Sequence, residues 1–285
     1  MTVKIVTDST ADLPPDVAGE LGITEVPLYV KFGDDVYRDR IDISSDELFS
    51  RLGSDPILPT TLPPTPQDFA DAYRTASKDA DAIVSIHISS KMSETCENAM
   101  KGRDIANVGC PVEVVDSLWV SAALGMLVTD AARGAIAGKK YDDIVSSVKD
   151  NIPKIDYLGI FDNLDYLNRG GRIGKAKAFL GTVMGVKLLL TIGDGEFLPF
   201  DRVYSYNKAL DRLRQFVVTA GKLKEIAVVH SAVPDDAELL AGRIKSILHR
   251  EPVPINIVNM GPVLGVHVGP GTLGAVIRLK TLDQL

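Results

Sequence analysis

The first apolar run of the chain, Lys4–Thr7, stops abruptly in a cluster of small polar residues, Asp8-Ser9-Thr10. Later runs end in the same way at Ser89-Ser90 and at Asp116-Ser117, and segments of helical length separate them. Strands that alternate with helices form βαβ units and a parallel sheet. The carboxyl ends of such strands meet at one edge of the sheet, where small ligands usually bind. The pattern therefore predicts both a fold class and the region of a binding site.

The periodicity of the N-terminal half predicts four strands and four helices. The expected strands are Lys4–Thr7, Glu25–Phe32, Ala82–Ser85 and Val112–Val115, and the expected helices are Ser45–Leu52, Thr65–Lys78, Glu94–Ala106 and Ser121–Ala137. Beyond about residue 150 the pattern changes to hairpins combined with helices. There the expected strands are Ile155–Phe161, Lys187–Ile192, Glu196–Val203, Glu225–His230, Ile255–Asn259 and Ala275–Leu279, and the expected helices are 174–185, Lys208–Leu223 and 235–249.

These patterns predict two α/β domains, because 285 residues exceed the size of one ordinary core. We expect a Rossmann-like domain with a parallel sheet and flanking helices over residues 1–150. A domain with a mixed sheet is expected over 151–285, because Gly193-Asp194-Gly195 between two strands is a hairpin signal. The boundary is approximate, and segments can cross it.

The net charge of −7 argues against general affinity for nucleic acid, which requires a basic surface. The two cysteines, Cys96 and Cys110, are expected to be reduced, because a chain of this size needs no disulfide. No cluster of residues has the spacing of a metal site. No secretory leader and no apolar stretch of membrane-spanning length is evident, so we expect a cytoplasmic protein.

Two polar segments stand out in the N-terminal half. Four prolines fall within residues 59–66, where Thr65 is expected to cap a helix while Thr61 has no such structural explanation. Ser93 follows an expected strand and is predicted to cap the next helix, whose free N–H groups attract anions. For each of these residues a purely structural role is the alternative.

In the C-terminal half, His267 is expected on a strand between Gly265 and Gly269, which would leave the space beside it open to a ligand. The alternative for His267 is a buried histidine that bonds to the backbone. His87 also falls on an expected strand, and we expect a structural role for it. The segment Arg169-Gly170-Gly171-Arg172 is interpreted as a tight basic turn, because it matches no phosphate-loop pattern.

Together these segments resemble the DegV family of bacterial fatty-acid-binding proteins over nearly the whole chain. The matching pieces, in order, are Ile5–Pro14, the Thr61 loop, the Ser-Ser-x-x-Ser segment that ends at Ser93, Val115–Ser117, Tyr166–Gly174 and Gly261–Gly271. Each piece alone is weak evidence for the family, whereas their order and spacing together are specific to it.

The resemblance implies two α/β domains that enclose one long-chain fatty acid in an apolar tunnel. It implies that Thr61, Ser93 and His267 hold the carboxylate, and we expect Asp8, Ser9, Thr60 and Thr95 to support them from behind. It also implies a non-catalytic carrier that presents the fatty acid to a separate kinase for acyl-phosphate formation, ahead of phospholipid synthesis. Neither a cofactor nor a metal is implied.

For the kinase, the resemblance points to a docking surface that includes Arg169, Arg172 and Arg202. We expect the carrier alone to be monomeric and to contact membranes transiently. The expected lining of the tunnel is apolar: Phe161, Leu164, Phe179, Val183, Met184, Leu189, Ile192 and Val266.

The chain departs from the family pattern at four places. The usual Thr-Ser-Gln-Pro is here Thr61-Leu62-Pro63-Pro64, and the usual Ser-Gly-Thr is Ser93-Glu94-Thr95. Val186-Lys187-Leu188 replaces Ile-Lys-Pro. The arginine linked to kinase docking would fall near Tyr204, and the nearest arginine in this chain is Arg202, two residues earlier on the same expected strand. These changes bear on the ligand and on the docking surface more than on the fold.

Physical chemistry is compatible with this function. Two hydroxyls and an imidazole N–H can satisfy a carboxylate by hydrogen bonding, and each buried methylene contributes about 0.8 kcal/mol of affinity. Two alternatives stay open at this point. Ser93 and His267 can be imagined as nucleophile and base of a small-molecule hydrolase or phosphotransferase, and the chain can also be a regulatory protein without a ligand.

Overall fold

The computed structural model describes residues 1–285 except 56, 182–184, 249–251 and 281–285. The chain forms two compact units. The first unit comprises residues 1–44 and 56–152, and the second comprises 45–55 and 153–285. Segment 45–55 thus packs with the C-terminal half of the chain, although it precedes most of the first unit in sequence.

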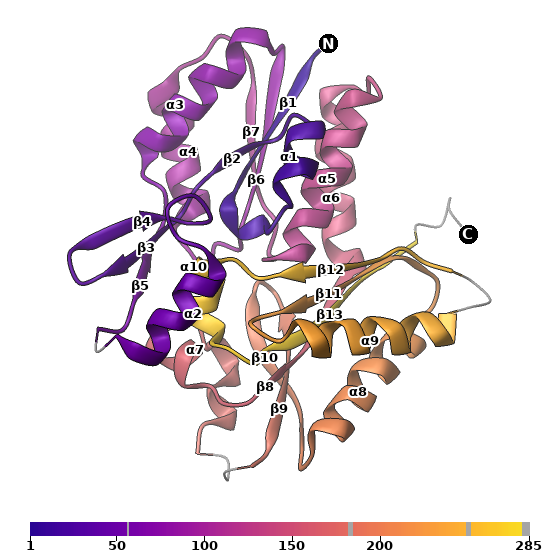
Figure 1. Ribbon diagram of the computed structural model, residues 1–285. Coiled ribbons are helices and arrows are strands. Elements are labelled where there is room, and N and C mark those ends of the chain that lie inside the picture. The colour runs from indigo at the N-terminus through magenta and orange to yellow at the C-terminus, as the bar shows by residue number, and fades with distance from the viewer. Residues whose placement is uncertain (56, 182–184, 249–251, 281–285) are drawn as a thin grey trace. The chain divides into compact units, whose positions relative to one another are not determined.

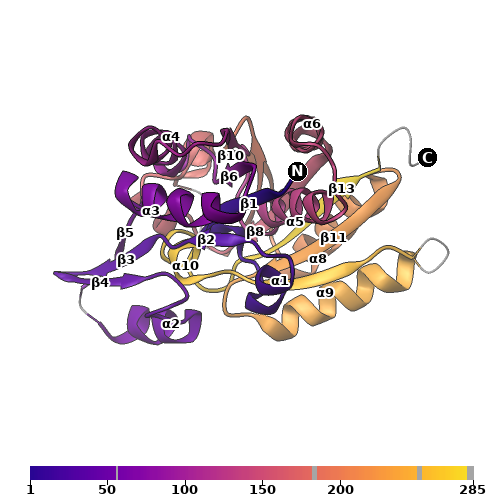
Figure 2. The ribbon, with the colours of Figure 1, turned by 90° about the horizontal axis from the view of Figure 1, so that it is seen from above.

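The first unit is built on a four-stranded parallel sheet in the order β2-β1-β6-β7. Its strands are β1 (Val3–Asp8), β2 (Thr24–Val26), β6 (Ala82–His87) and β7 (Val112–Asp116). Its α-helices are α1 (Pro15–Glu20), α3 (Pro66–Ala76), α4 (Thr95–Ala106), α5 (Ala122–Ile136) and α6 (Tyr141–Asn151). Figures 1 and 2 show α3 and α4 on one side of this sheet and α5 and α6 on the other. The predicted parallel sheet with flanking helices is confirmed.

Helices α3 and α4 pack unusually closely because α4 carries a glycine at their contact. A Cβ atom on Gly102 would lie 2.4 Å from the Cβ atom of Phe69 and 2.7 Å from the carbonyl oxygen of Pro66. Helix α3 itself begins with the predicted cap. The Thr65 hydroxyl accepts a hydrogen bond from the Asp68 amide, and the Asp68 carboxylate accepts one from the Thr65 amide. The start of α3 is therefore fixed both by its cap and by α4.

The predicted strand Glu25–Phe32 is wrong, because two strands occupy this stretch and belong to different sheets. Val26 ends β2, and β3 (Tyr29–Phe32) pairs instead with β4 (Asp35–Arg38) and β5 (Thr60–Leu62) in a three-stranded antiparallel sheet. Pro27, which lacks an amide proton, lies between the two strands. The Thr61 segment is consequently a strand and not the loop that its prolines predict.

The second unit contains a six-stranded mixed sheet in the order β10-β9-β8-β13-β11-β12. Its strands are β8 (Ile155–Phe161), β9 (Lys187–Gly193), β10 (Glu196–Val203), β11 (Leu223–His230), β12 (Ile255–Asn259) and β13 (Leu273–Leu279). Its α-helices are α2 (Ser45–Ser54), α7 (Asp165–Arg169), α8 (Tyr206–Thr219), α9 (Pro234–Ile247) and α10 (Pro262–Val268). Helices α8 and α9 bury their apolar faces on one side of β8, β11 and β13 (Figure 1). The predicted mixed sheet is confirmed.

Short 3₁₀ segments lie at Ser9–Ala11, Ser77–Asp79 and Ile152–Lys154. The predicted hairpin between β9 and β10 is confirmed. Asp194 and Gly195 both have positive φ angles, of 49° and 80°, as a type I′ turn requires.

The helix predicted over 174–185 is wrong in its type and length. A short 3₁₀ helix covers Gly174–Phe179, and Leu180 has an extended backbone with ψ of 141°. Glycines with positive φ angles at both ends of this region, Gly174 and Gly181, disfavour a continuous α-helix. Residues 182–184 and residue 249, which belong to predicted helices, lie outside the described residues.

Candidate functional site

The carboxyl end of β1 holds a buried carboxylate that joins two strand ends. Asp8 Oδ1 accepts hydrogen bonds from the Thr10 amide (3.1 Å) and hydroxyl (2.5 Å). Asp8 Oδ2 accepts one from the Ile88 amide (3.0 Å) and contacts His87 Nδ1 at 3.0 Å. The side chains of Asp8, Thr10 and His87 have no solvent exposure. Asp8 therefore fixes the polar turn after β1 to the end of β6.

Further acidic groups lie around this strand end. The Ser9 hydroxyl donates to Asp39 Oδ2 (2.7 Å) and accepts from the Leu28 amide (3.0 Å). Burial raises the pKa of Glu25 to about 7, with Arg40 opposing the shift and Asp8 and Asp39 adding to it. These buried acids disfavour an anion here. We therefore interpret Asp8 and Ser9 as groups that support neighbouring backbone.

Thr61 lies on β5, paired with Val30 of the central strand β3. Its side chain is partly buried, whereas Thr60 and Leu62 on either side are exposed. The alternation of a strand places these neighbours on the opposite face. Leu62 stands where the family usually has serine. Its apolar side chain therefore lies on the face of β5 opposite to the Thr61 hydroxyl.

Ser93 does not cap α4, contrary to the prediction. Its amide donates to the Ser89 carbonyl oxygen (3.1 Å), so that Ser93 belongs to a turn, and the helix begins at Thr95. Ser93 Oγ lies 2.8 Å from Thr95 Oγ1 and accepts a hydrogen bond from the Thr95 amide (3.3 Å). The departure at Glu94 adds an exposed carboxylate, whose charge is largely screened by water.

His267 lies on helix α10 and not on a strand. Pro262 occupies the first turn of α10 after the extended residue Gly261, and the amide of Gly265 donates to the Gly261 carbonyl oxygen (2.9 Å). The glycines do not leave open space. A Cβ on Gly265 would lie 2.6 Å from the Leu48 side chain of α2, so this glycine permits close helix packing.

The basic turn predicted at 169–172 packs directly against His267. A Cβ on Gly170 would lie 2.2 Å from His267 Nδ1, so only glycine fits there. Gly171 has the expected positive φ angle, of 72°. Arg172 Nη1 donates to the Gly170 carbonyl oxygen (2.6 Å), and the Arg169 guanidinium lies 4.9 Å from the centre of a tyrosine ring.

That ring belongs to Tyr166, whose position also explains why residue 269, two residues after His267, is a glycine. Gly269 has a φ angle of 70°, and a Cβ on it would lie 2.3 Å from the Tyr166 ring. Helices α7 and α10 therefore meet with almost no space between them. The sequence shows glycines in both the 169–172 turn and the 261–271 segment. It does not show that the turn packs into the space beside His267.

The environment of His267 favours a neutral imidazole. Burial lowers the pKa of His267 to about 4, and the positive charge of Arg172 adds to this effect. An imidazole of such low basicity is a weak general base near neutral pH. It can still donate one N–H hydrogen bond. His267 is thus better suited to bind an anion by hydrogen bonding than to activate Ser93 as a nucleophile.

The candidate residues are divided between the units. The first unit carries Asp8, Ser9, Thr60, Thr61, Ser93 and Thr95, and the second carries His267, Arg169, Arg172 and Arg202. Within the first unit, the structure brings Ser93 and Thr95 together. Within the second, it brings Arg172 to the turn beside His267. Arg202 lies exposed on the edge strand β10.

A cavity of about 480 Å³ lies in the second unit between the end of β8 and the start of β9. Its lining comprises Asp162, Asn163, Leu164, Asp165, Phe179, Leu180, Gly181, Gly185, Val186 and Leu188. Leu164 and Phe179 had been expected to contact an apolar ligand. Of the other expected contacts, Phe161, Leu189 and Ile192 are buried strand residues, Val266 is buried on α10, and Val183 and Met184 lie outside the described residues.

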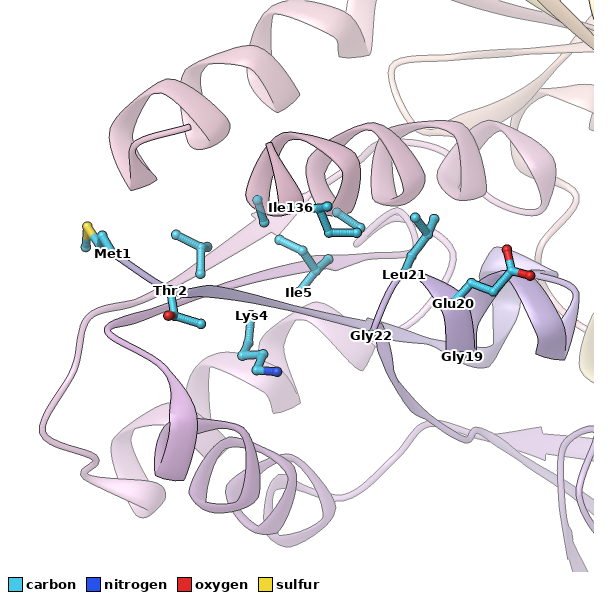
Figure 3. Close-up of a pocket in the computed structure, with 12 residues that line it drawn as sticks. Met1, Thr2, Lys4, Ile5, Gly19, Glu20, Leu21, Gly22 and Ile136 are labelled. Atoms are coloured by element: carbon cyan, nitrogen blue, oxygen red, sulfur yellow. The ribbon is translucent and has the colours of Figure 1, made fainter. Parts of the chain in front are cut away.

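A second hollow, of about 360 Å³, lies in the first unit at the opposite end of β1 from Asp8 (Figure 3). Residues 1–5, 19–22 and three residues of α5 line it. Met1 and Ile136 on its rim are 66% and 65% exposed. This hollow lies at the amino ends of the parallel strands, whereas ligands of such sheets bind at the carboxyl ends.

Among the residues that the structure describes, no group of three or more His, Cys, Asp or Glu side chains is arranged to hold a metal ion. Over the same residues, no helix combines the length and the apolar character that a membrane crossing requires. Cys96 and Cys110 are both free thiols.

We predict that the His267 imidazole stays neutral down to about pH 4, because burial and Arg172 disfavour its protonated form. The folded protein then binds fewer protons at this site than the unfolded chain between pH 6.5 and 4, so this group lowers stability as the pH falls. An NMR titration of the histidine ring resonances, assigned with His267→Gln, measures the midpoint. A midpoint near 6.5 would contradict the described environment.

Comparison with known proteins places the chain in a family. The model of the DegV family of uncharacterised proteins matches residues 2–280. A DegV domain-containing protein of Streptomyces coelicolor is 39% identical, over 98% of this chain and 99% of its own length. Two solved structures each match 98% of this chain and 100% of their own. They are a fatty-acid-binding DegV family protein from Thermus thermophilus, with 33% identity and a TM-score of 0.91, and the fatty-acid-binding protein DegV from Bacillus subtilis, with 28% identity and a TM-score of 0.88. The chain belongs to the DegV family.

Proposed function

We propose that this protein binds one long-chain fatty acid, with the carboxylate held by the hydroxyls of Thr61 and Ser93 and by the imidazole of His267. The observation that carries the proposal is the likeness to the T. thermophilus protein, which extends over 98% of this chain at a TM-score of 0.91. That protein binds fatty acid. A likeness of this extent makes the same class of ligand the simplest expectation here.

The chemistry of the three groups supports the proposal. Hydroxyl and neutral imidazole groups donate hydrogen bonds to a carboxylate without adding a full positive charge. His267 suits this role, because its lowered pKa keeps the ring neutral at physiological pH. Asp8, Ser9, Thr60 and Thr95 would support the binding residues from behind, as the hydrogen bonds of Asp8 and Thr95 with neighbouring backbone and side chains suggest.

For the acyl tail, we propose the cavity of about 480 Å³ in the second unit. Its size lies within the range of small-molecule sites, and Leu164, Val186 and Leu188 provide apolar contacts. Asp162 and Asp165 on its lining would repel a carboxylate, so the tail rather than the head group is the part that fits. Each buried methylene would add about 0.8 kcal/mol of affinity.

We propose further that the bound fatty acid is presented to a separate fatty acid kinase, which would phosphorylate the carboxyl group ahead of phospholipid synthesis. The carrier would then act in the cytoplasm as a monomer, with transient membrane contact and no catalysis of its own. Arg169 and Arg202 are exposed and are available to a partner. Together with Arg172 they form the proposed docking surface.

The head-group assignment predicts weaker binding after single substitutions. Thr61→Ala, Ser93→Ala and His267→Ala should each lower the affinity for palmitate by about 1.5–3 kcal/mol, because each removes a hydrogen bond to a charged group. Fluorescence or calorimetric titration of delipidated protein measures the effect, and lipid mass spectrometry identifies any fatty acid that co-purifies. Wild-type affinity in all three variants would refute the assignment, and an unliganded wild type that binds no fatty acid would refute the function.

The tail assignment predicts an effect that depends on chain length. Val186 is 7% exposed and lines the cavity, so Val186→Phe should fill part of it. Each methylene that can no longer be buried should reduce the binding free energy by about 0.8 kcal/mol. Stearate, which has the longer tail, should therefore lose more affinity than laurate. Val218→Phe on the exposed surface of α8 is the control. An equal loss for both ligands would exclude this cavity as the tail site.

The docking proposal predicts that the Arg202→Glu variant binds palmitate normally and supports acyl-phosphate formation poorly. Arg202 is exposed on β10, so reversing its charge should leave the fold intact. The assay combines loaded carrier, a purified fatty acid kinase and ATP, and it follows acyl phosphate. Arg214→Glu, at an exposed position of α8, serves as the matched control. Equal rates for both variants would rule out Arg202 as a docking residue.

A further inference from the structure

Four buried side chains of the first unit form a continuous line of hydrogen bonds, which we call the buried relay: Tyr73, Ser85, His87 and Asp8. The Tyr73 hydroxyl donates to Ser85 Oγ (2.9 Å), Ser85 Oγ lies 2.6 Å from His87 Nε2, and His87 Nδ1 lies 3.0 Å from Asp8 Oδ2. All four residues have 0% exposure. Burying such a line of polar groups costs free energy unless each group has its hydrogen-bond partners.

The strand period explains why these groups meet. Ser85 and His87 are two residues apart on β6 and therefore share one face. Asp8 follows Val6 on the same face of β1, which is the neighbour of β6. Val6 and Ile83 pack against α3 on this face, in the core that also contains Tyr73. Tyr73 and Phe69 of α3 thus contact the polar side chains near the carboxyl end of β6.

The relay has one consistent direction of hydrogen bonding. Because the Tyr73 proton is given to Ser85, the Ser85 proton is available to His87 Nε2. The Nδ1 proton of His87 then points to Asp8, whose other contacts are all donors. The order Ser-His-Asp resembles a catalytic triad, but a nucleophile must reach its substrate. Ser85 is wholly buried in the middle of β6 and already bonded on both sides.

The two ends of the relay lead toward the two segments that carry the proposed head-group hydroxyls, which are strand β5 with Thr61 and the turn with Ser93. At one end, Asp8 binds the Ile88 amide, which opens the turn that closes at Ser93. At the other end, the hydrogen bond of Tyr73 fixes the position of α3, whose cap Thr65 is separated from the end of β5 by two residues. The relay therefore ties the Thr61 segment to the Ser93 turn through one line of hydrogen bonds.

Aromatic packing keeps this line rigid. The Phe69 ring meets the His87 ring edge-on, with centroids 5.0 Å apart, and stacks against Tyr73 at 6.1 Å. Phe69 in turn lies against Gly102 of α4. Asn98 of α4 donates to the Pro64 carbonyl oxygen (2.9 Å), just before the cap of α3. Close packing of this kind resists displacement of single side chains.

We propose that Tyr73, Ser85 and His87 are positioning residues that set the spacing of the Thr61 and Ser93 hydroxyls for a ligand carboxylate. This rests on the proposed function and adds a cause for its selectivity. Hydrogen bonds to a charged group depend steeply on geometry. Loosening the relay should therefore weaken recognition of the carboxylate and leave recognition of the acyl tail unchanged.

The test compares palmitate with hexadecanol, a ligand with the same tail and no carboxylate. The variants are Tyr73→Phe, which removes one hydroxyl and keeps the ring, Ser85→Ala, and the double variant. Tyr206→Phe is the matched control, because it deletes a tyrosine hydroxyl that donates to Asp236 (2.8 Å) in the second unit. Thermal melting of each variant confirms that the protein is folded at the assay temperature.

The expected result is a roughly two- to tenfold loss of the palmitate-over-hexadecanol preference in Tyr73→Phe and Ser85→Ala. Hexadecanol affinity stays within about twofold of wild type, and the control keeps the full preference. The double variant should lose no more than Ser85→Ala alone, because both substitutions break one line of hydrogen bonds.

Wild-type preference in folded Tyr73→Phe and Ser85→Ala would overturn the positioning role while leaving fatty-acid binding intact. Equal losses for palmitate and hexadecanol would also overturn it, since they indicate a general structural effect. Additive losses in the double variant would contradict a single relay. A wild-type protein that binds neither ligand would refute the proposed function, and the positioning role with it.

Discussion

The Asp8 carboxylate is the interaction on which the first unit depends. A buried charge is tolerated only when hydrogen bonds replace its water, and Asp8 has donors from Thr10, Ile88 and His87 around both of its oxygens. Two of these donors are backbone amides of segments that follow different strands. The cost of burying the charge is therefore offset only when both strand ends adopt their native geometry, so that one side chain specifies how the ends of β1 and β6 meet.

The second unit fixes its candidate residue by close packing, which glycines at the contact points allow. Gly170, Gly265 and Gly269 each lie where a Cβ would collide with His267, Leu48 or Tyr166. The His267 imidazole consequently lies directly against Gly170 of the turn, and its burial together with the nearby charge of Arg172 lowers its pKa. One unit thus positions hydroxyls with a charged hydrogen-bond network, and the other positions a neutral imidazole by close packing. In both cases the rigidity of the surroundings is what would define a ligand group.

The sequence predicted the elements of the fold well and the local geometry of the candidate site less well. Strands such as Ile155–Phe161 and the hairpin at Asp194-Gly195 follow from periodicity and from turn chemistry, which are local properties. His267 was misassigned to a strand, because alternating valines and glycines fit a strand pattern, and only the packing against α2 and α7 favours a helix there. Ser93 was misassigned as a cap, because the competing turn to Ser89 is set by the strand end. Contacts between distant segments decided the case of His267, and a local turn decided the case of Ser93.

These features bear on how the proposed carrier would hold an anion and still release it. A lysine or arginine clamp would bind a carboxylate strongly, and two hydroxyls with a neutral imidazole bind it more weakly. The proposed head-group residues are of the weaker kind, and the acidic side chains of Glu25, which is partly buried, and Asp39, which is buried, disfavour an anion near β1. Affinity would then come mainly from the tail, while the hydroxyls select for the carboxylate. A ligand held in this way keeps its reactive group bound by bonds that exchange readily, which is what transfer to a second protein requires.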